Sequence, residues 1–418
     1  MTMQQIVREQ AQKAKQAAIA LAMFSEQEKN KILLAMADAL TNEQERILAA
    51  NALDMKAGRE KGMRESFLDR LLLTDIRLEA IAEGLRAVVK LPDPVGKIVE
   101  GSTLPNGLTI TKVKVPLGVI GIIYEARPNV TADAVGLCLK SGNAVILKGG
   151  SEAINSNKVI SDVLSVAGEH AGMPPGTVQF INTADREAVD ALIHLNGLVD
   201  VVIPRGSAAL IQMVVQNSTV PVIETGAGVC HTYIDAFASV NMAVEIAFNA
   251  KVSRPSTCNA METLLVNKHI ADKFMPAMLA KYKSAGVELI GDQEAQAYDE
   301  SMQAATENSW ATEYGDLRLN VKIVEDLDAA INHIRKYSTG HSEAIVTENY
   351  TNARKFQSAI DAAAVYVNAS TRFTDGFEFG FGAEIGISTQ KLHARGPMGL
   401  PELTTFKYLI NGNGQIRK

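Results

Sequence analysis

From residue 119 onward, short apolar runs alternate with longer segments in which apolar residues recur every three or four positions. Short apolar runs are typical of strands buried on both faces, and such strands form parallel sheets covered by helices. The alternation therefore predicts an α/β fold with a Rossmann-like first domain. In this first stretch we expect strands at 119–124, 144–147, 178–181, 199–203 and 222–224, and helices at 131–140, 152–171, 186–195 and 207–216.

A second alternation follows residue 258 and predicts a second α/β domain. The chain has 418 residues, which is too long for one compact core and agrees with two or more domains. In this stretch we expect strands at 263–266, 287–290, 319–324, 344–347 and 364–367, and helices at 271–285, 327–337 and 349–359.

The first 90 or so residues have the periodicity of amphipathic helices. Ser25 with Glu28, and Thr41 with Gln44, have the spacing of capping boxes, in which two side chains satisfy amides at a helix N-terminus. We therefore expect one helix to begin after Ser25 and another after Thr41.

Residues 108–115, LTITKVKV, alternate apolar and polar side chains and predict a two-faced strand, as half of a hairpin that reaches out from the body. The tail at 403–410 is also strand-like, and we expect it to pair with 108–115 across a subunit boundary. Residues 371–399 are glycine-rich and irregular, as expected of a functional loop or an interface.

The composition excludes several classes of function. A net charge of -6 and the absence of long basic runs argue against nucleic acid as a partner. No stretch is apolar enough to cross a bilayer, and the N-terminus lacks the apolar core of a signal peptide, so we expect a cytoplasmic protein with no membrane partner. His333 and His341 match no metal geometry, and no metal is expected.

The most reactive candidate is Cys258 in KVSRPSTCNAME at 251–262. A thiol in a polar loop beside Arg254 can ionise and act as a nucleophile. Cys138 lies in an apolar helical pattern and Cys230 in a strand-like run, so we expect both to be packing residues. His231 cannot pair with Cys230, because neighbours on a strand point to opposite faces.

The segment LKGGSEA at 147–153 places a lysine and two glycines between a predicted strand and a predicted helix. Backbone amides at a helix start suit an anionic ligand, although the same residues also suit a plain tight turn. The dinucleotide fingerprint G-x-G-x-x-G is absent after the first strand, so ordinary pyrophosphate binding is not predicted.

Several segments, in order along nearly the whole chain, together resemble the aldehyde dehydrogenase superfamily. They are VPLGVIGIIYEARPNV at 115–130, LKGGSE at 147–152, VIPRGS at 202–207, ETGAG at 224–228, STCNA at 256–260 and GLPELTTFKYLI at 399–410. Within the superfamily, DLDAAINHIRKYSTGHSEAI at 326–345 is similar to the signature of the γ-glutamyl phosphate reductase family. SRPSTCNA, VNASTRF, FGAEIGIST and HARGP also look specific to that family.

The resemblance implies roles for individual residues. Cys258 would be the nucleophile, and Asn129 with the Cys258 backbone N–H would stabilise the oxyanion. An anionic substrate needs cations, for which the candidates are Arg127, Arg254, Arg372 and Arg395. The expected cofactor-binding residues are Lys148, Ser151, Gly206, Ser207 and Glu224.

The implied reaction is the NADPH-dependent reduction of L-glutamyl 5-phosphate to L-glutamate 5-semialdehyde through a cysteine thioester, in proline biosynthesis. Lys148 and Ser151 could hold the 2′-phosphate of NADPH. Glu224 as a general base would direct water to the thioester, which is the opposite outcome, and a structural or ribose-binding role for it stays open. A coenzyme A-dependent relative and a non-catalytic protein of the same fold are the rival interpretations.

The resemblance also implies a domain organisation and partners. Residues 1–104 and 117–226 would bind the cofactor, 227–398 would form the catalytic domain, and 105–116 with 399–418 would be oligomerisation strands. A homo-oligomer is expected, and a transient association with glutamate 5-kinase would protect a labile acyl phosphate.

Overall fold

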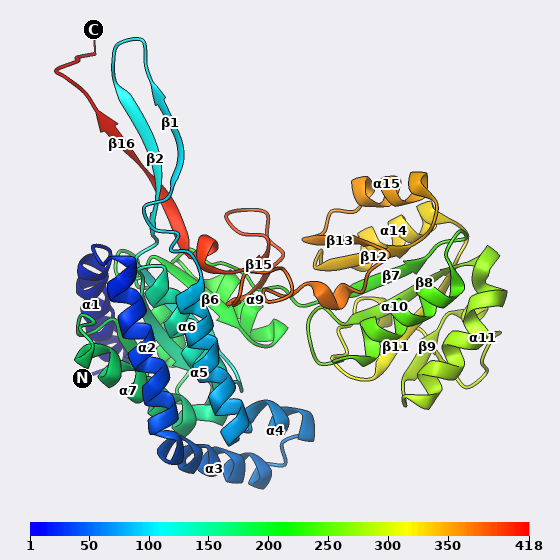
Figure 1. Ribbon diagram of the computed structural model, residues 1–418. Coiled ribbons are helices and arrows are strands. Elements are labelled where there is room, and N and C mark those ends of the chain that lie inside the picture. The colour runs from blue at the N-terminus through cyan, green and yellow to red at the C-terminus, as the bar shows by residue number, and fades with distance from the viewer. Residues whose placement is uncertain (418) are drawn as a thin grey trace. The chain divides into compact units, whose positions relative to one another are not determined.

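The computed structural model describes residues 1–417, and these residues divide into two compact units. Unit 1 comprises Met1–Thr225, Gly380–Gly386 and the chain from Met398 onward. Unit 2 comprises Gly226–Phe379 and Ile387–Pro397. Each unit contains a parallel sheet with helices packed against it, which agrees with the predicted α/β class (Figure 1).

The parallel sheet of unit 1 has the strand order β5-β4-β3-β6. Every residue of β3 and β4 is buried, which explains why their sequences are uninterrupted apolar runs. Helix α1 packs against β3 and β4 through Val7, Ala11 and Ala14. The strands are β3 (Val119–Tyr124), β4 (Ala144–Gly149), β5 (Val178–Phe180) and β6 (Val201–Arg205), and the helices that follow them are α6 (Asn129–Lys140), η1 (Ser151–Ala153), α7 (Ile154–His170), α8 (Glu187–Ile193) and α9 (Ala208–Asn217).

The N-terminal region is helical as predicted. The capping box of Ser25 and Glu28 is present at the start of α2. The one predicted for Thr41 and Gln44 is wrong, because α2 continues through Asn42 and the Thr41 hydroxyl contacts the Ala37 carbonyl and Glu79. The helices are α1 (Met3–Leu21), α2 (Glu26–Asn42), α3 (Gln44–Glu60), α4 (Glu65–Leu71) and α5 (Asp75–Lys90).

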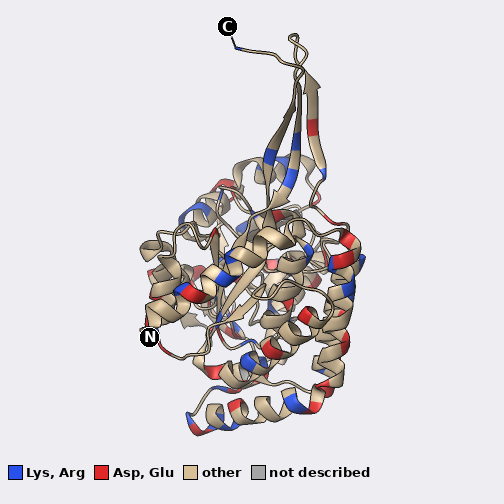
Figure 2. Cartoon of the chain, turned by 90° about the vertical axis from the view of Figure 1, so that its left-hand side faces the viewer, with Lys and Arg blue, Asp and Glu red and all other residues tan. Residues whose placement is uncertain are grey.

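An antiparallel sheet of β1 (Ile98–Thr103), β2 (Thr109–Pro116) and β16 (Thr404–Asn411) projects from the helices of unit 1 (Figure 1). The hairpin predicted for 108–115 is confirmed, with β1 as its other half. β16 pairs with β2 within the same chain, which corrects the expected pairing across a subunit boundary. Lysines cluster near the base of this sheet, and its outer part carries few charges (Figure 2).

The parallel sheet of unit 2 has the strand order β10-β9-β11-β8-β7-β12-β13. One core packs around Phe274 and Tyr282 of α11, and another around Phe356 of α15. The strands are β7 (Cys230–Ile234), β8 (Met261–Asn267), β9 (Glu288–Gly291), β10 (Gln303–Ala304), β11 (Arg318–Val324), β12 (Ser342–Val346) and β13 (Ala364–Val367). The helices are α10 (Val240–Val252), α11 (Lys268–Ser284), α12 (Gln293–Gln296), α13 (Glu307–Trp310), α14 (Leu327–Tyr337), α15 (Tyr350–Ala359) and η2 (Thr371–Phe373).

Two further sequence predictions need correction. Residues 222–224 do not form a strand, and Val222 makes only an isolated bridge with Val202. The helix predicted for 152–171 begins with the 3₁₀ turn η1, which precedes α7. The segment 371–399 is irregular as expected, apart from η2 and the short strands β14 (Gly386–Ser388) and β15 (Gly396–Met398). The turn η3 (Leu400–Leu403) then leads into β16.

The N-terminus of α7 is held by a carboxylate from another helix. Asp54 of α3 is buried and accepts hydrogen bonds from the backbone amides and side chains of Asn155 and Ser156, at 2.6–3.2 Å. A carboxylate satisfies the unpaired amides of a helix start and complements the positive end of the helix dipole. Asp54 therefore fixes the point where the LKGGSEA turn enters its helix.

We expect Asp54→Ala to lower the free energy of unfolding by about 3 kcal/mol, because it leaves buried donors without their charged acceptor. Urea unfolding followed by circular dichroism measures this change. Asp162→Ala is the matched control, since Asp162 forms an exposed pair with Lys158 on α7 and should cost less than about 1 kcal/mol. Equal losses in the two variants would contradict the capping role.

Candidate active site

The segment 253–260, termed here the nucleophile loop, joins the end of α10 to the start of β8. Its Cys258 is partly exposed, whereas Cys138 and Cys230 are buried. Burial raises the pKa of the Cys138 and Cys230 thiols, so both stay protonated at neutral pH. The burial of these two cysteines confirms their predicted packing roles and leaves Cys258, among the cysteines of the described chain, as the accessible thiol.

A buried ion pair closes the base of the nucleophile loop. Lys251 at the end of α10 and Glu262 at the start of β8 are both inaccessible to solvent, and their Nζ and Oε2 atoms lie 2.7 Å apart. Burial raises the pKa of the Glu262 carboxyl to about 7 and lowers that of Lys251. The second Glu262 oxygen accepts the Gly315 amide at 3.1 Å, so the pair also holds the segment before β11.

The backbone of Cys258 is packed tightly from the other side. The Cys258 carbonyl accepts a hydrogen bond from the Cys230 thiol at 3.2 Å. A Cβ atom placed on Gly228 would lie 1.5 Å from this carbonyl oxygen, so only glycine fits there. The ETGAG segment at 224–228 therefore ends in a glycine at the position where it passes the Cys258 backbone.

The predicted substrate cations differ in their surroundings. Arg372 donates to the Asn259 side chain and interacts electrostatically with Cys258 and Arg254. Burial, with the Arg254 charge as a second cause, lowers the pKa of Arg372. Arg395 instead pairs with Asp361 at 2.8 Å. Arg254 thus lies in the nucleophile loop with Cys258, and Arg372 is bonded to that loop through Asn259, while Arg127 belongs to unit 1.

Asn129, the predicted oxyanion donor, is the first residue of α6 in unit 1. Its amide donates to the Asp133 carboxylate at 3.0 Å, one helical turn later. Burial raises the pKa of Asp133 to about 6. Asp133 was not foreseen, although the four-residue spacing after Asn129 signals such a contact. The carboxylate orients the amide, and the joint action of Asn129 with Cys258 of unit 2 remains a prediction.

Lys148 lies at the end of β4, where the sheet meets η1 and α7. Its side chain is buried and donates to the Gly149 carbonyl at 2.8 Å, and burial lowers its pKa. A Cβ on Gly149 would lie 2.3 Å from Asn157 Nδ2, and one on Gly150 would lie 2.1 Å from Glu152 Oε2. The two glycines therefore let the Asn157 and Glu152 side chains pack directly on the turn.

Two polar atoms that pack on this turn lack a hydrogen-bond partner. Asn157 Nδ2 and Glu152 Oε2 are buried and have no hydrogen-bond partner among the described residues. Sequence analysis did not identify Asn157 or Glu152, because their role depends on how α7 leaves the turn. With Lys148 and the exposed Ser151, they form a donor and acceptor set that fits the ribose and phosphate of a nicotinamide cofactor.

The turn after β6 carries the other predicted cofactor residues. Ser207 caps α9 and donates its backbone amide to the Glu125 carboxylate at 2.7 Å. A Cβ on Gly206 would lie 2.4 Å from the same carboxylate, so a larger residue here would displace the Glu125 side chain. Glu224 is half-buried and follows the Val202–Val222 bridge in unit 1.

Comparison with known proteins identifies the family. The model of the aldehyde dehydrogenase family matches residues 2–299. The chain belongs to the aldehyde dehydrogenase family. Two relatives over the full length are γ-glutamyl phosphate reductases. That of Moorella thermoacetica is 59% identical and aligns over 99% of both chains. The crystal structure from Thermotoga maritima has 48% identity and a TM-score of 0.95, and covers 99% of this chain and 100% of its own.

The fold extends to more distant aldehyde dehydrogenases. An acetylating aldehyde dehydrogenase from Geobacillus thermoglucosidasius has 18% identity and a TM-score of 0.73, and covers 100% of this chain and 98% of its own. These likenesses confirm the predicted aldehyde-dehydrogenase-like α/β fold and the resemblance to the γ-glutamyl phosphate reductases. The chain is accordingly an oxidoreductase of this family.

Metal ligands and membrane spans were both expected to be absent, and residues 1–417 can be compared with that expectation. No cluster of histidine, cysteine and acidic side chains suited to a metal ion occurs among them. None of their helices combines the length and the apolar character that a bilayer span requires.

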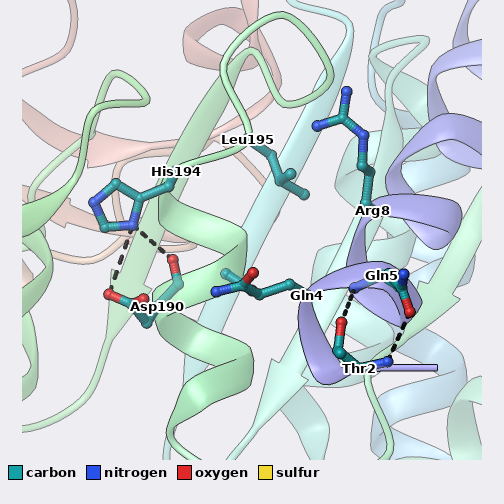
Figure 3. Close-up of a pocket in the computed structure, with 8 residues that line it drawn as sticks. Thr2, Gln4, Gln5, Arg8, Asp190, His194 and Leu195 are labelled. Atoms are coloured by element: carbon teal, nitrogen blue, oxygen red, sulfur yellow. Dashed lines mark hydrogen bonds and ion pairs between the residues drawn. The ribbon is translucent and has the colours of Figure 1, made fainter.

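A surface hollow in unit 1 lies apart from the predicted site residues. It is bordered by the start of α1, with Thr2, Gln5 and Arg8, and by α8 with Asp190 and the adjoining His194 (Figure 3). The dashed contacts there are local, such as the Thr2–Gln5 cap and the His194 ring with Asp190. These contacts stabilise helix ends and supply no nucleophile.

We expect iodoacetamide to modify Cys258 in the native protein at least about tenfold faster than Cys138 or Cys230, since alkylation requires an exposed thiolate. Peptide mass spectrometry after a short exposure quantifies each site. Alkylation in urea is the control, because unfolding should bring the three rates close together. Equal native rates would contradict the reactive role of Cys258.

Proposed function

We propose that the protein reduces L-glutamyl 5-phosphate to L-glutamate 5-semialdehyde and phosphate, with NADPH as reductant, in the second step of proline biosynthesis. The observation that carries the proposal is a partly exposed thiol at Cys258, in a loop that contains Arg254 and is hydrogen-bonded to Arg372 through Asn259. An acyl phosphate needs both a nucleophile and cations. The full-length likeness to γ-glutamyl phosphate reductases supports the same substrate.

In this mechanism the Cys258 thiolate attacks the acyl carbon, and the carbon–oxygen bond to phosphate breaks with its electron pair leaving on phosphate. The developing oxyanion would be stabilised by the Asn129 amide and the Cys258 backbone N–H. NADPH, when bound, would supply the hydride that reduces the carbonyl carbon of the thioester. The carbonyl then re-forms as the carbon–sulfur bond breaks with its electron pair on sulfur, which releases the aldehyde and restores the Cys258 thiolate.

The residues that would hold the cofactor are Lys148 and Ser151 at one turn, and Gly206, Ser207 and Glu224 at the other. A lysine with a serine three positions later suits the 2′-phosphate of NADPH. The orphaned Asn157 amide adds a donor at the same turn. Glu224 would contact the ribose or support its loop, because a base directed at water would divert the thioester to the acid.

The candidate arginines would bind the two anionic groups of the substrate, its phosphate and its α-carboxylate. Arg254 and Arg372 are proposed to bind the phosphate or the α-carboxylate near Cys258. Arg127 precedes Asn129 and would add a cation from the neighbouring motif. Arg395 stays a candidate, and its pair with Asp361 would have to open or be shared on binding.

Residues 1–104 and 117–226 are proposed to bind the cofactor, and 227–398 to form the catalytic domain. We also propose a cytoplasmic location and a transient association with glutamate 5-kinase, because an acyl phosphate hydrolyses readily and benefits from direct transfer.

We expect the protein to oxidise glutamate 5-semialdehyde with NADP⁺ only when phosphate is present. The nicotinamide absorbance follows the reaction. Cys258→Ser should lower kcat by at least about a thousandfold, as is usual when a nucleophile is removed. Cys138→Ala, a change far along the chain in a buried helix, should retain activity. Activity with coenzyme A in place of phosphate would reject this function and favour the rival acylating enzyme.

We further propose that the β1-β2-β16 sheet mediates self-association. Its β16 strand exposes Phe406, Tyr408 and Ile410, by 46%, 57% and 61% respectively. Exposed apolar side chains on an edge strand are typical of an interface that another chain covers. The sparse charge on the outer part of the sheet supports the same conclusion (Figure 2).

We expect the double variant Tyr408→Asp with Ile410→Asp to elute as a smaller species, because two carboxylates oppose burial of the strand. Light scattering after gel filtration gives the mass. Ile76→Asp is the control, since Ile76 is 83% exposed on α5 outside the sheet. A wild-type protein that is already monomeric, or a double variant of unchanged mass, would refute the interface.

A further inference from the structure

Asn259, the residue after the nucleophile, is the most densely hydrogen-bonded side chain of the nucleophile loop. It is only 2% exposed. Its Nδ2 donates to the carbonyls of Arg372 at 3.2 Å and Thr374 at 2.9 Å. Its Oδ1 accepts from the Thr257 hydroxyl at 2.9 Å and from the Arg372 guanidinium. The amide therefore uses all of its hydrogen-bonding capacity.

The backbone of Asn259 is held as well. Its carbonyl accepts the Thr371 hydroxyl at 2.7 Å, and Thr371 is fully buried. These contacts come from one short turn, η2 with the residue after it, which contains Thr371, Arg372 and Thr374. This turn therefore hydrogen bonds to both the side chain and the backbone of Asn259. The nucleophile loop is thereby attached to this turn immediately beside Cys258.

The remaining face of the turn is also occupied. The Thr374 hydroxyl hydrogen bonds to Ser342 at 2.6 Å and to Tyr366 at 2.7 Å, which ties the turn to β12 and β13. The turn is thus part of the rigid sheet of unit 2. Asn259 connects this turn to Cys258, the preceding residue. Because its buried amide is fully hydrogen-bonded, the side chain has no alternative partners that would let it shift.

We propose that Asn259 is a positioning residue that holds Cys258 and Arg372 at a set separation, and so aligns the thiol with a cation-bound acyl phosphate. The same amide oxygen that accepts from the loop hydroxyl of Thr257 accepts from Arg372, so the nucleophile and the cation share one anchor. Asn259 itself need not touch substrate. The identity of the substrate in this inference rests on the proposed function, whereas the hydrogen bonds of Asn259 do not.

The test compares Asn259→Leu with Asn143→Leu. Leucine has a similar volume and no hydrogen-bonding groups, so each change removes buried hydrogen bonds. Asn143 is fully buried in unit 1, where it bonds Gly118 and Leu403 at 2.8 Å, and it serves as the matched control. Both variants should be less stable, as urea unfolding would show.

Only Asn259→Leu should change the chemistry. We expect its kcat to fall about a hundredfold, the usual effect of a displacement of about 1 Å at reacting groups, with a smaller change in KM. Its rate of alkylation at Cys258, measured without substrate, should differ from wild type by more than about fivefold. Asn143→Leu should match wild type in kcat and alkylation under conditions where it is folded.

A milder pair keeps the test decisive should Asn259→Leu fail to fold. Thr371→Val removes the hydroxyl bond to the Asn259 carbonyl, and Thr404→Val removes a similar but partly buried bond to the Pro401 carbonyl at 2.6 Å. We expect Thr371→Val to lower kcat about tenfold and Thr404→Val to leave it unchanged.

Wild-type alkylation rates in both Asn259→Leu and Thr371→Val would overturn the positioning role. This readout needs no substrate, so it remains valid if glutamate 5-semialdehyde proves not to be turned over. A loss of kcat without any change in alkylation would also count against the proposal, because a displaced loop must alter the accessibility of the thiol.

Discussion

The nucleophile loop depends on an ion pair that water cannot reach. Lys251 and Glu262 bring together the end of a helix and the start of a strand, and the loop between them carries Cys258. Removal of one partner from such a pair typically costs about 3–5 kcal/mol, because the other charge stays buried and uncompensated. The ion pair therefore links the two ends of the loop, and losing either partner would disturb the segment that carries Cys258.

Much of the fold could be predicted, because strands that are buried on both faces have uninterrupted apolar sequences. The strands at 119–124 and 364–367 and the helix at 327–337 were predicted at their observed bounds. The order of the strands within each sheet was not predicted, since neighbours such as β11 and β8 are distant in sequence. The cap at Thr41 failed because a local motif cannot reveal that the preceding helix continues past it.

The candidate site was predictable only in part. Cys258 could be identified from its polar, cation-bearing loop, and Lys148 from a glycine-rich turn at a strand end. Asn259 could not, because its partners Thr371, Arg372 and Thr374 are 112–115 residues away. Asp133 was predictable only in part. Its four-residue spacing from Asn129 is visible in the sequence, but the hydrogen bond matters because the Asp133 carboxyl is partly buried. Single-residue chemistry is thus easier to foresee than the hydrogen bonds that orient it.

The division of the described chain into units has a consequence for dissection by cloning. Both units are assembled from separate segments, and the backbone passes between them after residues 225, 379, 386 and 397. A fragment that ends near 225 would lack β16 and expose the edge of β2 along its length. A single cut in the gene therefore separates neither unit intact. An isolated unit 1 would need residues 380–386 and the chain from 398 onward joined to 1–225, and unit 2 would need 387–397 joined to 226–379.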